Sequence, residues 1–102
     1  MLVKIHKSYR IVVAICDSNL IGKKFEEKFD KGIKQLYLRE NFYKGEEKTY
    51  KETLDIIKKQ VMEDATFNIV GEESVKAAKE AGIITKKGIK KIQGIPYALV
   101  LL

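Results

Sequence analysis

An unbroken apolar run, Ile11–Cys16, limits the folds open to this chain, because four of its six residues are Ile or Val. A short, continuous, β-branched run is typical of a central strand that is covered on both faces of its sheet. The other long apolar run, residues 97–102, predicts a terminal strand, which must be buried because an exposed apolar edge promotes aggregation. Both runs are far shorter than the roughly 20 residues that a membrane-spanning helix needs, so we expect a cytoplasmic protein with no membrane partner.

Three further segments have the patterns of short strands: residues 2–7, 33–40 and 89–93. A period of two places one side of such a segment in the core and the other in solvent. Residues 20–32 are ambiguous, because Phe25 and Phe29 have helical spacing while glycines bracket a charged segment. We expect a short helix or an irregular charged loop there.

Helical patterns gather in the middle of the chain. The strongest predicts a helix over residues 50–62, where apolar side chains share one face and Thr49 with Glu52 forms a capping box. A shorter helix is expected over 65–70. A third is expected over 72–81, because two glutamates stand at the N-terminal end, which favours acidic residues.

The order of these elements indicates the fold class. Strands at both ends with helices between them predict an α+β fold, in which N- and C-terminal strands form a mostly antiparallel sheet and two to three central helices pack on one face. With 102 residues, the chain has the length of a single domain, residues 1–102. The simplest layout pairs the first strand with the last, inside the sheet.

Positive charge is concentrated at the two ends of the chain. The formal net charge is +6, yet all 14 acidic residues lie between positions 17 and 80. Segments 1–16 and 81–102 carry three and four basic residues and no acid, so neighbouring first and last strands would pool this charge. A composition rich in lysine and glutamate is also typical of thermophiles, so the same charge can be the solvated surface of a heat-stable protein.

Basic strands interleaved with aromatic rings are one way that sheet-based folds hold single-stranded RNA, because cations follow the backbone and rings stack on bases. The leading hypothesis is therefore a non-enzymatic RNA-binding module, associated with translation or RNA processing. Its expected contacts are Lys4, His6, Arg10, Lys86, Lys87, Lys90, Lys91 and Tyr97. The alternative interpretation of these residues is a set of solvated edge lysines that guard against aggregation.

A protein adaptor without nucleic-acid binding is the alternative function. Phe42 and Tyr43 lie in an expected loop, and large aromatic side chains are enriched at protein interfaces. The apolar terminal strand could extend a sheet across two copies of the chain. These features indicate docking to a protein partner or formation of a homodimer.

A small-ligand enzyme is the second alternative. Cys16 and Asp17 end the central strand, where catalytic groups often lie, and Asn68 and Glu72 could complete a site. A cysteine nucleophile needs a base, and the one histidine, His6, is expected to lie well away from it, so no catalytic residue is assigned. One cysteine and one histidine also exclude an internal disulfide and a Cys/His zinc site, and we expect no metal and no cofactor.

Four short motifs stand in order along nearly the whole chain. They are Ile15-Cys16-Asp17 with Leu20-Ile21-Gly22-Lys23, then Asn41-Phe42-Tyr43-Lys44-Gly45, Asn68-Ile69-Val70-Gly71-Glu72 and Ile92-Gln93-Gly94-Ile95-Pro96-Tyr97-Ala98. Together they resemble a family of small archaeal proteins known as a domain of unknown function, DUF424. The resemblance implies an archaeal, cytosolic, stand-alone domain and brings no activity, cofactor or catalytic residue. That family often has histidine after the proline of the last motif, where this chain has Tyr97, so any chemistry at that position would differ here.

Overall fold

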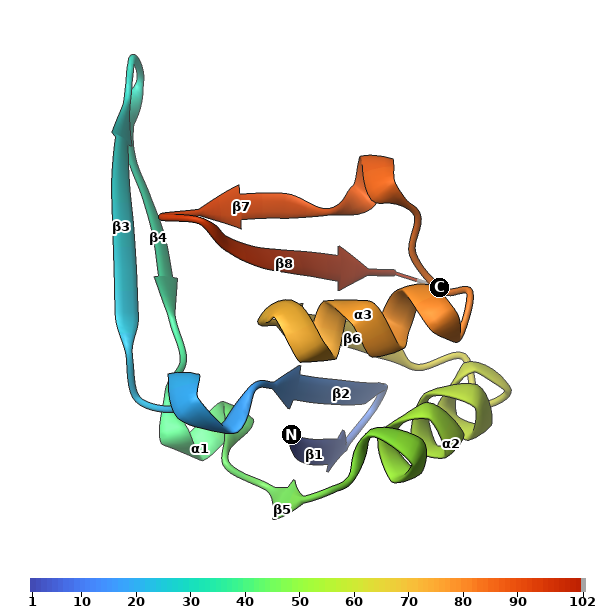
Figure 1. The fold of residues 1–102 in the computed structure, drawn as a ribbon. Coiled ribbons are helices and arrows are strands. Elements are labelled where there is room, and N and C mark those ends of the chain that lie inside the picture. The colour runs from blue at the N-terminus through green and yellow to red at the C-terminus, as the bar shows by residue number, and fades with distance from the viewer. Residues whose placement is uncertain (102) are drawn as a thin grey trace.

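The computed structural model describes residues 1–101, which form a six-stranded sheet, a two-stranded hairpin and three α-helices (Figure 1). In spatial order the sheet strands are β5 (Glu46–Glu47), β1 (Leu2–Lys7), β2 (Ile11–Cys16), β6 (Thr66–Val70), β8 (Ile95–Val100) and β7 (Lys90–Ile92). Within the described range β2 and β6 form the one parallel pair of this sheet, and its other pairs are antiparallel. The expected α+β class with a mostly antiparallel sheet is confirmed.

Helices α2 (Tyr50–Val61) and α3 (Glu72–Glu80) cover one face of the sheet, here called the front face, which is turned toward the viewer in Figure 1. Side chains from both helices pack with Phe67 and its strand neighbours in the main core. The predicted capping box begins α2: the Glu52 N–H donates to Thr49 Oγ1 at 3.1 Å, and the Thr49 N–H donates to Glu52 Oε1 at 2.9 Å. The helix expected over 72–81 corresponds to α3.

Two local predictions are wrong. Residues 24–29 form the strand β3 (Lys24–Phe29), which pairs with β4 (Gly32–Tyr37) in an antiparallel hairpin, rather than a short helix or loop. Most of the helix expected over 65–70 is instead the strand β6. Four of its five residues are β-branched or aromatic and favour a strand, it is hydrogen-bonded on both edges, and Phe67 and Ile69 are fully buried, so a possible helix cap at Asp64 was misleading.

The first and last strands are not neighbours, which corrects the simplest layout. β2 and β6 lie between β1 and β8. The crossover through α2 makes β6 the parallel partner of β2, and β8 then pairs with the other edge of β6. Since neighbouring strands lie about 4.8 Å apart, β1 and β8 are separated by roughly 14 Å.

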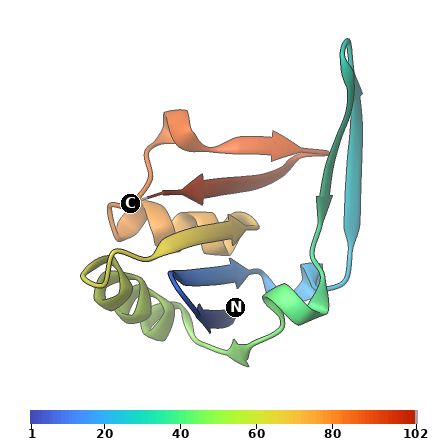
Figure 2. The same ribbon diagram turned by 180° about the vertical axis from the view of Figure 1, so that it is seen from behind.

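The hairpin and α1 (Glu40–Tyr43) lie at one end of the sheet (Figure 1). They pack a second buried cluster against the opposite face of the sheet, here called the rear face; its members are Leu2, Ala14, Cys16, Leu20, Leu38, Tyr43 and Val70. The short 3-10 turns η1 (Ser18–Leu20) and η2 (Lys86–Gly88) complete the chain path. Seen from behind, the rest of the rear face has no helix over it (Figure 2).

Candidate nucleic-acid interface

The register of the sheet places side chains from five strands on the rear face, because directly paired residues project to the same side. One row across the sheet is Lys4, Ala14, Asn68 and Leu99, and the next is Leu2, Cys16, Val70, Tyr97 and Lys90. Two residues beyond Lys4, His6 lies on the same side. Four of the sequence-predicted RNA contacts therefore share this face: Lys4, His6, Lys90 and Tyr97.

The rear face is basic and partly open. Strands β1, β2, β6, β8 and β7 place no acidic side chain on it, whereas they place two lysines and a histidine there. Leu99 is 60% exposed, and Asn68 and Tyr97 beside it are half-buried. The result is an accessible sheet surface with an aromatic ring, an apolar side chain and an amide between flanking cations.

Helix α1 orders the β1 side of this surface. The Lys4 ammonium donates to the Asn41 carbonyl at 2.9 Å. His6 Nε2 lies 2.9 Å from the Phe42 carbonyl oxygen, which can only accept, so this nitrogen carries the proton. The imidazole also stacks on the Phe42 ring, with centroids 4.7 Å apart and planes inclined by 17°. These contacts fix the imidazole in one orientation over β1.

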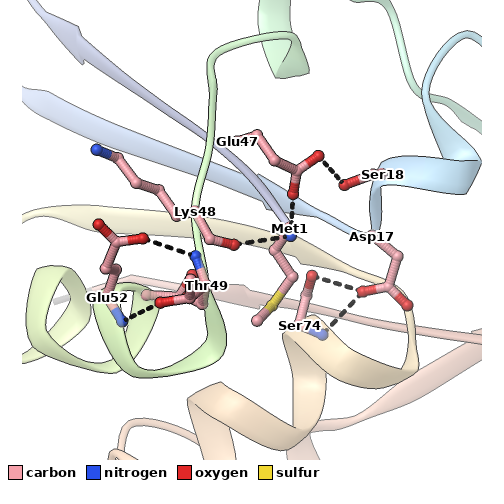
Figure 3. Close-up of polar contacts among 9 residues, drawn as sticks. Met1, Asp17, Ser18, Glu47, Lys48, Thr49, Glu52 and Ser74 are labelled. Carbon is pink, nitrogen blue, oxygen red and sulfur yellow. Dashed lines mark hydrogen bonds and ion pairs between the residues drawn. The ribbon is translucent and has the colours of Figure 1, made fainter.

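Glu47 is the acidic residue at the β5 edge of the rear face, where it pairs with Leu2. Its carboxylate accepts from the Met1 amine at 2.5 Å and from the Ser18 hydroxyl at 2.6 Å (Figure 3). The hydrogen bond from the amine is the main reason that the pKa of Glu47 is lowered. Its negative charge is therefore balanced by the chain's own N-terminal cation.

The other predicted cations lie elsewhere. Arg10 is exposed in the turn between β1 and β2, and Lys86 and Lys87 lie in η2. Lys91 points to the front face, because it alternates with Lys90 along β7. The charge of the two chain ends is thus spread over the molecule, which corrects the expectation that neighbouring first and last strands pool it.

The aromatic pair expected in a loop belongs to α1. Tyr43 is only 6% exposed and Phe42 is half-buried, with their ring centroids 5.0 Å apart in an edge-to-face contact. The terminal strand β8 is hydrogen-bonded to β6 on one edge and to β7 on the other, so it has no free edge to offer a second copy. Both features that suggested an adaptor are therefore used within the chain.

Asp17 caps α3 (Figure 3). Its Oδ1 accepts from the Ser74 N–H at 2.9 Å and from the Ser74 hydroxyl at 2.8 Å, while Oδ2 accepts from the Glu73 N–H at 3.1 Å. The residue at the N-cap position is Gly71, which has no side chain, so the end of β2 supplies the cap. Gly71 has a φ of +109°, and a Cβ atom there would overlap the Asp17 carboxylate, so this position requires glycine.

Cys16 is fully buried in the cluster under α1. Burial, assisted by the neighbouring Asp17 carboxylate, raises the pKa of the Cys16 thiol to about 12. Burial likewise raises the pKa of the Tyr43 hydroxyl to about 12. A thiol with so high a pKa is protonated at neutral pH and is a poor nucleophile.

Of the four residues considered for a small-ligand site, Asp17 and Glu72 line a shared hollow of about 350 Å³ at the start of α3, whereas Cys16 and Asn68 are not part of its lining. Asn68 lies on the rear face, and Glu72 is exposed in the first turn of α3 on the front side. Cys16 is in the buried cluster and Asp17 is the helix cap. Within residues 1–101, no group of three or more His, Cys, Asp or Glu side chains is placed to hold a metal ion. No helix in that range combines the length and apolar character needed to cross a membrane.

Comparison with known proteins places this chain. The model of the family described as "Protein of unknown function (DUF424)" matches residues 6–102. The chain belongs to the DUF424 family. The four sequence motifs thus identified the family correctly, and they fall at the end of β2, in α1, at the β6–α3 junction and along the β7–β8 turn.

A solved structure shares the fold of this DUF424 protein. The crystal structure of an uncharacterized conserved protein from Methanopyrus kandleri is similar with a TM-score of 0.83 and 25% identity, over 98% of this chain and 90% of that chain. No curated protein matches the chain.

One rear-face residue, Leu99, is absent from the sequence-based predictions. Residues 97–102 look apolar on both sides, because Ala98 and Val100 face the core while Leu99 alternates with them on the open side. Alternation between small and large apolar residues gives no polar signal, so the sequence could not show that one side of β8 is uncovered.

Proposed function

We propose that this DUF424 protein is a non-enzymatic RNA-binding module, associated with translation or RNA processing, and that its rear face holds single-stranded RNA. The observation that carries the proposal is that Lys4, His6, Lys90 and Tyr97 project from one partly open sheet face to which five strands contribute no acidic side chain. Sheets that bind single-stranded RNA use the same combination of exposed rings and flanking cations.

Each part of the face suits a part of the nucleotide. The Tyr97 ring and the apolar Leu99 side chain can support bases, because every base has an apolar π-face. The Asn68 amide between the flanking strands carries a donor and an acceptor for a base edge. Lys4 and Lys90 lie on strands four steps apart, roughly 19 Å, and can contact phosphates at either side of a few stacked nucleotides.

The test is fluorescence anisotropy with a labelled, mixed-sequence 12-nucleotide RNA at several salt concentrations. Charge reversal in Lys4→Glu/Lys90→Glu should weaken binding by about tenfold or more, and should lower the slope of log affinity against log salt by about 1.4, because each lost phosphate contact on a single strand contributes about 0.7. The matched control is Lys51→Glu/Lys58→Glu, which changes the same charge at two exposed positions of α2. This control should bind with nearly the affinity of the parent protein.

Stacking and charge can be separated with one more variant. Tyr97→Ala should weaken RNA binding by about tenfold, the effect of one lost base–aromatic stack, and should leave the salt slope unchanged. No RNA binding at low salt would refute the proposal and leave protein docking as the function to pursue. Equal losses in the rear-face and α2 double variants would also refute it, because the attraction would then depend on net charge alone.

A further inference from the structure

A groove on the front side of the molecule lies outside the proposed RNA surface. It has a volume of about 460 Å³ and runs between α3 and the segment that leads through η2 into β7. Its lining residues are Glu72, Val75, Lys76, Lys79, Lys86, Ile89, Lys91 and Pro96. A volume of this size is typical of small-molecule sites.

The groove exists because the helical layer is narrower than the sheet. Two helices cover the front face as far as β8, where α3 packs, and β7 lies one strand beyond it at the edge. Along α3 the lining residues Val75 and Lys79 recur at helical spacing, so a single side of the helix forms one wall. Ile89, Pro96 and Val75 give the groove an apolar floor.

Lysine side chains line both walls of the groove. Lys76 and Lys79 come from α3, and Lys86 and Lys91 come from the opposite side, whereas Glu72 is the one acidic residue in the lining. In the part of the chain that the structure describes, none of the four ammonium groups forms an ion pair. Lys76 makes a cation–π contact, with its ammonium 5.7 Å from the centre of the Tyr50 ring.

Charge complementarity therefore identifies the occupant. Lysines on both walls of a shared apolar floor outnumber the single acidic residue in the lining, and an anion placed among them relieves their mutual repulsion while the floor removes an apolar body from water. We propose that the groove binds a small amphipathic organic anion, with its ring or short aliphatic body on Val75, Ile89 and Pro96 and its sulfonate, phosphate or carboxylate between the lysines. The site is independent of the RNA surface, because Lys90 and Lys91 project to opposite faces of the sheet.

The probe is 1-anilinonaphthalene-8-sulfonate, whose fluorescence rises in an apolar site, titrated into the native chain of residues 1–102. We expect saturable binding of one probe per chain that weakens as salt is added. Its uncharged analogue N-phenyl-1-naphthylamine should bind about tenfold more weakly, since a charge-assisted contact contributes about that factor. An equal affinity for the two probes, or no saturable binding of the sulfonate, would overturn the proposal.

Variants locate the probe. Lys76→Glu/Lys91→Glu and, separately, Lys79→Glu/Lys86→Glu should each weaken sulfonate binding by about tenfold, and because all four lysines are exposed, urea midpoints should stay close to that of the parent. Lys4→Glu/Lys90→Glu should leave sulfonate binding unchanged, and Lys76→Glu/Lys91→Glu should bind RNA nearly as the parent does. Unchanged sulfonate binding in both groove variants would overturn the proposal that the groove binds the anion, whatever the outcome for RNA.

Discussion

The two faces of the sheet are built from the same strands and differ in how much of each face is covered and in the side chains that stay accessible. On the front, Val13, Ile15, Phe67 and Ile69 are fully buried beneath α2 and α3. On the rear, the hairpin and α1 cover one part of the sheet, while Lys4, Asn68 and the exposed Leu99 also project from this face. Strand alternation thus puts the main core on the front face and leaves polar, accessible groups on the uncovered part of the rear face, which is why we place the proposed function there.

A pair of substitutions on β6 and β8 tests this division most strongly. Phe67→Ala should lower the free energy of unfolding by about 4 kcal/mol, because it opens a cavity in the front core, whereas Leu99→Ala on the rear should cost less than about 0.5 kcal/mol. Urea denaturation of each variant measures the difference. Equal costs would mean that the rear face is covered and cannot be a binding surface.

Substitutions at the junction between the end of β2 and the start of α3 should have the next largest effect on stability. Gly71→Ala should destabilise the protein by about 3 kcal/mol, because alanine is strained at this φ and its Cβ overlaps the Asp17 carboxylate. Asp17→Ala should cost about 2 kcal/mol through loss of the α3 cap.

The double variant Asp17→Ala/Gly71→Ala separates the overlap of the new Cβ atom with the Asp17 carboxylate from the backbone strain at position 71. When Asp17 is replaced by alanine, the overlap with the Cβ atom at position 71 disappears. The destabilisations of the two single variants should therefore add up to about 1 kcal/mol more than the destabilisation of the double variant. Strict additivity in the same urea experiment would show that the carboxylate does not occupy the space over Gly71.

Alkaline pH distinguishes the covered part of the rear face from its open part. Folding raises the pKa of Cys16 from 9.0 to about 12 and that of Tyr43 from 10.0 to about 12, so both hold their protons longer in the folded state. Stability present below pH 9 should therefore fall as pH rises toward 12, by about 1.4 kcal/mol per pH unit for each such group.

Between pH 9 and 10 the thiol is the group expected to dominate this loss, because the unfolded chain releases the proton of Cys16 but still retains that of Tyr43. Cys16→Ala should therefore flatten the stability profile in that interval, as followed by urea midpoints. A profile that is equally steep in the variant would show that α1 does not exclude water from the thiol.

Local patterns in the sequence predicted much of this fold and less of its interface. The capping box of α2 and the strands at both ends follow from spacing alone. The eight expected RNA contacts were grouped because the first and last strands were expected to be neighbours, and only four of them lie on the rear face. The predictions that failed, those of β6 and of the strand order, depend on pairing between segments that are distant in the sequence. Nothing local in residues 65–70 shows that they enter the sheet beside β2, and that insertion separates the two basic chain ends.

Mapping the RNA contact on the folded chain tests the central claim most directly. Unlabelled 12-nucleotide RNA, titrated into ¹⁵N-labelled protein, should shift the amide signals of β1 around Lys4, of β6 around Asn68 and of β8 around Tyr97, and should leave those of α2 nearly unmoved. Shifts confined to α2 and α3, or spread evenly over every exposed lysine, would contradict the assignment of RNA binding to the rear face.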